Sequence, residues 1–212
     1  MAFLGLTDLV YRITLQCARF FYANMLWIFF TIAGLGIFGL FPATRALVSL
    51  VHIWDEDRSA PIFKTFYKEF RESFLQANAT GWMLTPLAAL PAYGIYLAQN
   101  WANPASVYVM FMLVGLFLFV LSYAWFVFPV QFLTGEKRLA ASWKNTLFIS
   151  ITSPHIFLGM VFAFLAVLAV LVFTGFFIFF FASVSVWIMM KGTKFAMRHI
   201  QKRQDHSMPA LT

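Results

Sequence analysis

The sequence predicts an all-α fold: a polytopic transmembrane bundle of about five helices, with cytoplasmic amphipathic helices after the first span. Hydrophobic residues make up 62% of the 212 residues and charged residues only 11%, against about 45–50% and about 25% in soluble domains. A chain of this size cannot bury so much apolar surface in a water-soluble core. Three long stretches, residues 20–44, 73–135 and 145–190, contain no Lys, Arg, Asp or Glu. We therefore expect a single membrane domain over residues 1–212.

The length of each uncharged stretch gives the number of spans that it can form, because about 20 apolar residues cross the hydrocarbon core. The first stretch fits one span. The second holds two, separated by a polar, proline-containing break at Gln99–Pro104. The third is too long for one tilted helix, so two short spans that meet at Thr174 and Gly175 are expected. The expected spans are residues 20–41, 80–98, 106–131, 156–173 and 176–191.

Basic residues give the expected orientation, because they are enriched in cytoplasmic loops. The loop at residues 99–104 contains no Lys or Arg. Three islands contain five, three and five of them: residues 45–72, 136–144 and 191–205. All three islands can face the cytoplasm only if the last uncharged stretch crosses the membrane twice, which gives five spans. The basic tail, residues 191–212, is therefore expected in the cytoplasm.

An odd number of spans places the N-terminus outside, in a multi-pass protein of the plasma membrane. Arg12 and Arg19 then lie on the side that basic residues avoid. The enrichment of basic residues in cytoplasmic loops is a statistical bias, so two basic residues on the other side are tolerated. An alternative stays open, in which the first segment dips into the membrane and returns without crossing.

Residues 43–78 are expected to form amphipathic helices at the cytoplasmic surface. Pro42 suits the first position of a helix, and Pro61 can open a second one. In that second helix one face is aromatic, at the spacing of an α-helix, and the other face is charged. The aromatic positions are Phe63, Phe66, Tyr67, Phe70 and Phe74. This stretch is an interfacial helix on the leaflet or a docking surface for a partner, and the two interpretations are compatible.

The segment before it is rich in glycine. Gly34, Gly36 and Gly39, followed by Pro42, make a poor continuous helix. At membrane depth such a backbone must be buried against protein or line a cavity. It is either a turn at the end of a span, with close helix approach, or a broken element at a protein interface. The expected partner contacts are Gly34, Gly36, Gly39, Pro42, Phe63, Phe66, Phe70 and Phe74.

No pattern of catalytic, cofactor-binding or metal-binding residues is found, so we expect no enzyme, no cofactor and no bound metal. No Asp, Glu or Arg lies inside an expected span, where ionisable residues usually mark proton or ion pathways. The sequence has no phosphate-binding Walker loop, no nucleophile elbow and no His-x-x-x-His zinc motif. The net charge of +7 lies in loops beside the spans, which favours membrane lipids over nucleic acid as partners.

Two runs of residues resemble a known family. The run Trp27 to Thr44, WIFFTIAGLGIFGLFPAT, and the run Pro61 to Asn78, PIFKTFYKEFRESFLQAN, are similar to the YesL family of bacterial integral membrane proteins. The resemblance implies a multi-pass protein of the bacterial plasma membrane without established enzymatic activity. Family members are often encoded beside parts of carbohydrate ABC transporters. The resemblance therefore implies a non-enzymatic accessory subunit of such an importer, packed against its permease subunits.

Two other functions stay open. The chain could be a permease-like transport subunit itself, although the island at Glu136–Thr146 lacks the glycine of a permease coupling helix. It could also be a small membrane enzyme, which would need a reactive set of residues that the sequence does not present.

Overall fold

The computed structural model describes residues 2–57, 60–136 and 138–207, and within these ranges the chain forms α-helices and no β-strand. The seven described helices are α1 (Ala2–Ala33), α2 (Ile37–Glu56), α3 (Ile62–Gln99), α4 (Ser106–Thr134), α5 (Leu139–Thr152), α6 (Pro154–Phe173) and α7 (Phe177–Ser207). The predicted all-α, multi-helix membrane fold is confirmed.

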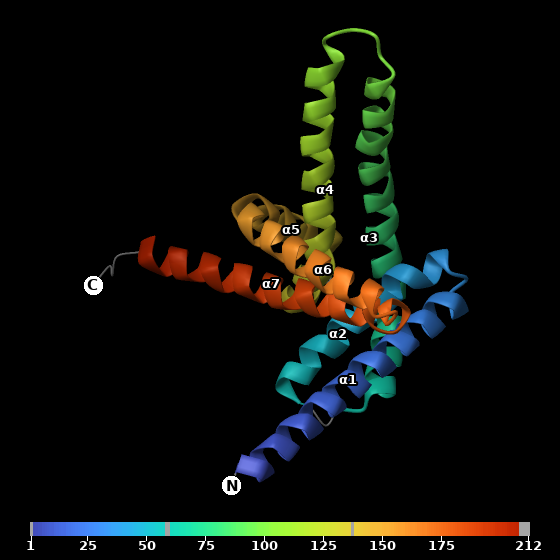
Figure 1. Cartoon of the computed structure of the whole chain (residues 1–212). Coiled ribbons are helices and arrows are strands. Elements are labelled where there is room, and N and C mark those ends of the chain that lie inside the picture. The colour runs from blue at the N-terminus through green and yellow to red at the C-terminus, as the bar shows by residue number, and fades with distance from the viewer. Residues whose placement is uncertain (1, 58–59, 137, 208–212) are drawn as a thin grey trace.

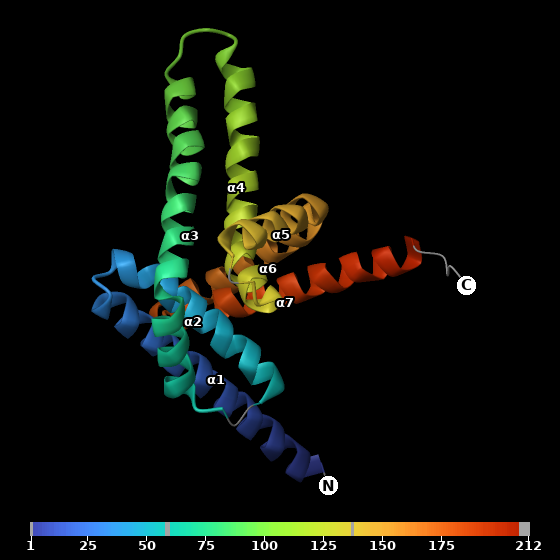
Figure 2. The ribbon, with the colours of Figure 1, turned by 180° about the vertical axis from the view of Figure 1, so that it is seen from behind.

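Six of these helices pair into three antiparallel hairpins (Figures 1 and 2). In α1/α2 the Phe20 ring lies 5.8 Å from that of Trp54. Nearer the turn, the Trp27 indole N–H donates a hydrogen bond to Thr44 Oγ1 at 3.1 Å. The contacts within α3/α4 and α6/α7 follow the same antiparallel order.

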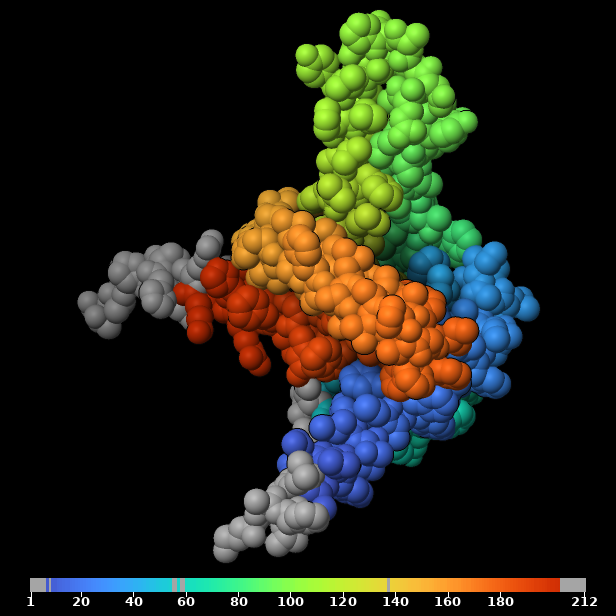
Figure 3. Space-filling model, viewed as in Figure 1, coloured from blue at the N-terminus to red at the C-terminus, as the bar shows by residue number. Residues whose placement is uncertain are grey.

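The α3/α4 hairpin projects from the rest of the molecule as a two-helix arm (Figures 1 and 3). Around its base, α1, α2, the first half of α3, the last part of α4 and α7 share one hydrophobic core. A second core joins α4 to α5, α6 and α7. Only Ser153 separates α5 from α6, whose first residue is Pro154, a position where the missing proline N–H has no partner to lose.

Four of the described helices are long and apolar enough to cross a membrane: Ile37–Trp54, Ser106–Thr134, Pro154–Phe173 and Phe177–Lys202. The last three match the spans expected at 106–131, 156–173 and 176–191, although the last helix begins one residue later, at Phe177. The span expected at 80–98 lies in the outer half of α3, which is a single helix from Ile62 to Gln99. The prolines, tyrosines and tryptophan of this segment give it a lower mean hydropathy than the four apolar segments named above.

Residues 20–41 do not form one continuous helix as expected for a single span, because a turn divides this segment between α1 and α2. Leu35 and Gly36 both have positive φ, 62° and 73°, a conformation that reverses the chain and that glycine adopts without strain. The Gly36 N–H donates to the Thr31 carbonyl at 2.8 Å, which caps α1. A Cβ on Gly34 would overlap Gly39, so both glycines are needed for the close approach of the two helices.

Pro42 does not open a helix as predicted, because α2 begins at Ile37 and continues through it. A proline inside a helix leaves the carbonyl four residues earlier without its donor. Here that carbonyl belongs to Phe38, and the Asn78 side chain in α3 donates to it at 2.9 Å. The helix therefore continues because a neighbouring helix supplies the missing hydrogen bond.

Candidate functional site

A buried polar network lies at the base of the α3/α4 hairpin. Arg45 in α2 is only 8% exposed, and its guanidinium donates to Gln131 Oε1 in α4 at 2.7 Å. Its Nε lies 3.3 Å from Glu69 Oε1 in α3. The Gln131 amide donates in turn to Thr80 Oγ1 at 3.0 Å. The four side chains connect α2, α3 and α4 where the hairpin leaves the body of the molecule.

Burial explains why these four residue types occur together. A guanidinium removed from water is strongly unfavourable unless charge and hydrogen bonds compensate it. Glu69 supplies the opposite charge and the Gln131 amide oxygen a neutral acceptor. The Thr80 hydroxyl satisfies the Gln131 amide and donates to the Gln76 carbonyl at 2.9 Å. Loss of one member would leave another buried and unpaired.

A cavity of about 530 Å³ adjoins the network, between α2, α3 and the end of α4. Arg45 and the carboxylates of Glu69, Glu72 and Glu136 line it, so three negative charges face one positive charge. Among the described residues, no group of three or more His, Cys, Asp or Glu is placed to hold a metal ion. The arrangement can hold helices in register and accept hydrogen bonds from a polar or basic group.

A second buried polar contact fixes α1 to α7. Asn24 is 1% exposed, and its amide donates to the Ile178 carbonyl at 2.7 Å while its oxygen accepts from the Ala182 N–H at 2.9 Å. An uninterrupted helix pairs these two backbone groups with each other. The Asn24 side chain bonds to both of them, which positions the α6/α7 hairpin against α1.

Comparisons with known proteins match the part of the chain that contains most of this network. Residues 20–95 match a family described as a protein of unknown function, DUF624. In Bacillus subtilis (strain 168), uncharacterized protein YesL is 29% identical over 194 residues, which are 91% of each chain. These matches support the resemblance of the chain to the YesL family.

Two further relatives from Bacillus subtilis (strain 168) match shorter parts of this chain. Uncharacterized protein YteU is 33% identical over 135 residues, 62% of this chain and 56% of the relative. Uncharacterized protein YesV is 28% identical over 128 residues, 58% of this chain and 60% of the relative. No solved structure matches the chain. The matched region 20–95 contains Arg45, Glu69 and Thr80 of the network, whereas Gln131 lies outside it.

Many of the residues predicted to contact a partner pack inside the chain. Gly39 and Pro42 are buried in the α1/α2 hairpin. Phe66 is fully buried, 5.3 Å from the Phe30 ring, and Phe70 lies 4.9 Å from the same ring. The start of α3 therefore covers the α1/α2 hairpin, and partner contact by these residues stays a prediction.

The other predicted contacts keep some accessible surface. Phe63 is 51% exposed. Gly36 is half-buried, with nothing within 4 Å of the position of a Cβ. Gly34 and Phe74 are half-buried. These residues lie near the α1/α2 turn and along α3, and they form no continuous surface with the buried ones.

The sequence did not predict the four-residue network. Arg45 and Glu69 both lie in the basic island at residues 45–72, which is expected at the cytoplasmic surface, and no sequence pattern singles out Gln131. The sequence does contain a polar residue in each of the three helices, but it does not show that these helices are neighbours. Without the fold, nothing pairs Arg45 with a residue 86 positions away.

Proposed function

We propose that this chain is a non-enzymatic subunit of a transport complex in the bacterial plasma membrane, and that its α3/α4 hairpin packs against the helices of a permease. One observation carries the proposal: the hairpin projects beyond the other helices with its apolar side chains uncovered (Figure 3). The exposed side chains include Leu87, Leu90, Tyr93, Leu97, Val107, Phe111, Met112 and Leu116.

Helices in a membrane associate through close packing rather than through hydrophobic exclusion from water. Gly115 in α4 is exposed, and a Cβ there would meet nothing within 4 Å. By contrast, Gly94 in α3 faces its own partner helix, where a Cβ would lie 2.9 Å from Leu113. The hairpin thus has one small residue that holds its two helices together and another that leaves room for a third helix.

The polar network supports this role because it holds the hairpin at a fixed angle. Arg45 joins α2 to both helices of the hairpin. An arm with a fixed orientation loses less conformational freedom on binding, which favours association.

The family resemblance of the runs at 27–44 and 61–78 suggests the partner, the permease of a carbohydrate importer.

The basic ends of the hairpins suggest the orientation of the chain in the membrane. Because α1 and α2 are antiparallel, Arg12 and Arg19 lie at the same end of that hairpin as Lys64, of the basic island at residues 45–72. We place both termini in the cytoplasm, so that the first hairpin enters the membrane from that side and returns.

Co-purification tests this function. A tagged chain is expressed with a carbohydrate permease pair and purified in mild detergent, and the retained permease is quantified. We expect Gly115→Leu to reduce retention about tenfold, a loss of about 1.4 kcal/mol. Gly159→Leu in α6 is the matched control, because this glycine also has nothing within 4 Å of its Cβ position.

Two results would contradict the proposal. One is that no permease is retained by the unsubstituted chain. The other is that both glycine variants lose it equally. Transport by the chain reconstituted with an ATPase subunit alone would instead identify it as a transport subunit.

A further inference from the structure

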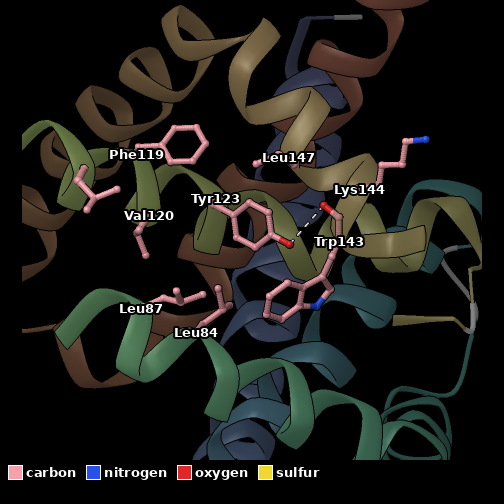
Figure 4. A pocket seen from close by; sticks show the side chains of 9 residues that line it. Leu84, Leu87, Phe119, Val120, Tyr123, Trp143, Lys144 and Leu147 are labelled. Carbon is pink, nitrogen blue, oxygen red and sulfur yellow. Dashed lines mark hydrogen bonds between the residues drawn. The ribbon is translucent and has the colours of Figure 1, made fainter. Parts of the chain in front are cut away.

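A separate pocket lies on the side of the hairpin that faces α5. Its volume is about 390 Å³, which is in the usual range for small-ligand sites. Side chains from three helices line it, and most of them are aliphatic or aromatic (Figure 4). The apolar walls include Leu84, Leu87, Leu116, Phe119, Val120 and Leu147. Such walls favour a hydrocarbon chain as the occupant.

Polar groups gather at the α5 side of this pocket. The Tyr123 hydroxyl donates to the Trp143 carbonyl at 3.3 Å, and so is satisfied within the protein. The Trp143 indole N–H is buried and has no acceptor among the described residues. A buried donor without an acceptor costs about 1–3 kcal/mol. Neither the hydroxyl nor the indole nitrogen presents accessible surface to the pocket, so both close this side of it.

Lys144 gives this end a positive charge. Its side chain is exposed at the rim, and Figure 4 shows the ammonium group directed away from the leucines. It is the last cation of the basic island at residues 136–144, whose other cations are Lys137 and Arg138. Negatively charged lipid headgroups attract such clusters at the cytoplasmic leaflet. The pocket therefore combines an apolar interior with one cationic edge.

We propose that this pocket binds one acyl chain of an anionic phospholipid, with the phosphate at Lys144. A soluble anion would leave the apolar walls uncovered, and a neutral lipid would leave the charge unused. The helices that form the pocket carry the exposed apolar surface of the hairpin, so acyl chains surround its opening. This site does not depend on the proposed partner or on transport.

Lipid retention in native mass spectrometry tests the site. The purified chain is stripped of lipid in detergent and then incubated with dioleoyl phosphatidylglycerol or dioleoyl phosphatidylcholine, which differ only in the headgroup. We expect one phosphatidylglycerol per chain to be retained, with a preference of about fivefold over phosphatidylcholine. Lys144→Gln should remove this preference, while Lys64→Gln, at an exposed lysine of α3, should keep it.

Filling the pocket tests the acyl-chain part separately. Leu147→Trp places a larger side chain at a position that is already 43% exposed, and we expect it to abolish retention of both lipids. Phe119→Trp is a second filling variant if the first does not fold. Equal retention of the two lipids by the unsubstituted chain, or full retention by both filling variants, would overturn the proposal.

Discussion

At the scale of single residues, this fold depends on side chains that complete the backbone of a neighbouring helix. Asn78 donates to the Phe38 carbonyl that Pro42 leaves without its helical partner, and Asn24 joins two backbone groups of α7. In a membrane no water can replace such bonds. An amide at these positions is therefore needed for the shape of another helix.

The Asn78 contact gives a prediction with an internal control. We expect Asn78→Ala to lower the free energy of unfolding by about 1–3 kcal/mol, since it leaves the Phe38 carbonyl without a hydrogen-bond partner. In a Pro42→Ala background the new backbone N–H can bond to that carbonyl, so the same substitution should cost less. Thermal unfolding of the four proteins in detergent, followed by tryptophan fluorescence, gives the coupling between the two sites. Equal costs in both backgrounds would show that the bond does not compensate the proline.

The buried Arg45 gives a second prediction at this scale. Arg45→Met should destabilise the protein by about 3–5 kcal/mol, because it leaves Glu69 and Gln131 without their shared partner. Combining it with Glu69→Gln should recover part of the loss, since the unpaired charge is removed. The comparison variant is Lys64→Met, on the exposed face of α3, for which a change within about 0.5 kcal/mol is expected. Additive losses from the Arg45 and Glu69 variants would exclude a coupled pair.

At the scale of helices, the α1/α2 hairpin depends on glycines that no other residue can replace without moving the backbone. A Cβ on Gly39 would lie 2.6 Å from the Phe30 carbonyl oxygen and would overlap that of Thr31. These atoms are backbone, so they cannot rotate away as a side chain can.

Gly39→Ala should therefore lower the free energy of unfolding by about 1–3 kcal/mol. Gly159→Ala in α6 should leave it unchanged or raise it, because nothing lies within 4 Å of that Cβ position and alanine favours the helix. Thermal unfolding in detergent measures both. A Gly39→Ala protein as stable as the original would mean that the two helices can separate without loss.

The sequence predicted the later helices better than the first one, for a physical reason. The spans at 106–131, 156–173 and 176–191 are long runs of lipid-compatible residues, and composition alone identifies them. In the run at 20–41 the turn is defined by φ angles at Leu35 and Gly36 and by the contact of Gly34 with Gly39. Glycine content indicates that a break is possible there, but a turn and a close helix crossing have the same composition.

At the scale of the whole molecule, the three hairpins account for the distribution of charge. The turns of α1/α2, α3/α4 and α6/α7, at residues 34–36, 100–105 and 174–176, contain no charged residue. The basic islands lie at the opposite ends of the same hairpins, except for Arg45, which is buried within α2. A three-hairpin arrangement therefore satisfies the positive-inside rule without the exception at Arg12 and Arg19 that a single crossing by residues 20–41 requires.

Cys17 makes the orientation of the first hairpin directly measurable, since it is the only cysteine in the sequence and is exposed on α1. It lies between Arg12 and Arg19, at the end of the hairpin that we place in the cytoplasm. A membrane-impermeant maleimide should leave it unlabelled in intact cells and label it in inverted vesicles. The control is Cys17→Ser combined with Ala102→Cys in the α3/α4 loop, where the opposite pattern is expected. Labelling of Cys17 in intact cells would show that α1 and α2 together cross the membrane once, with the N-terminus outside.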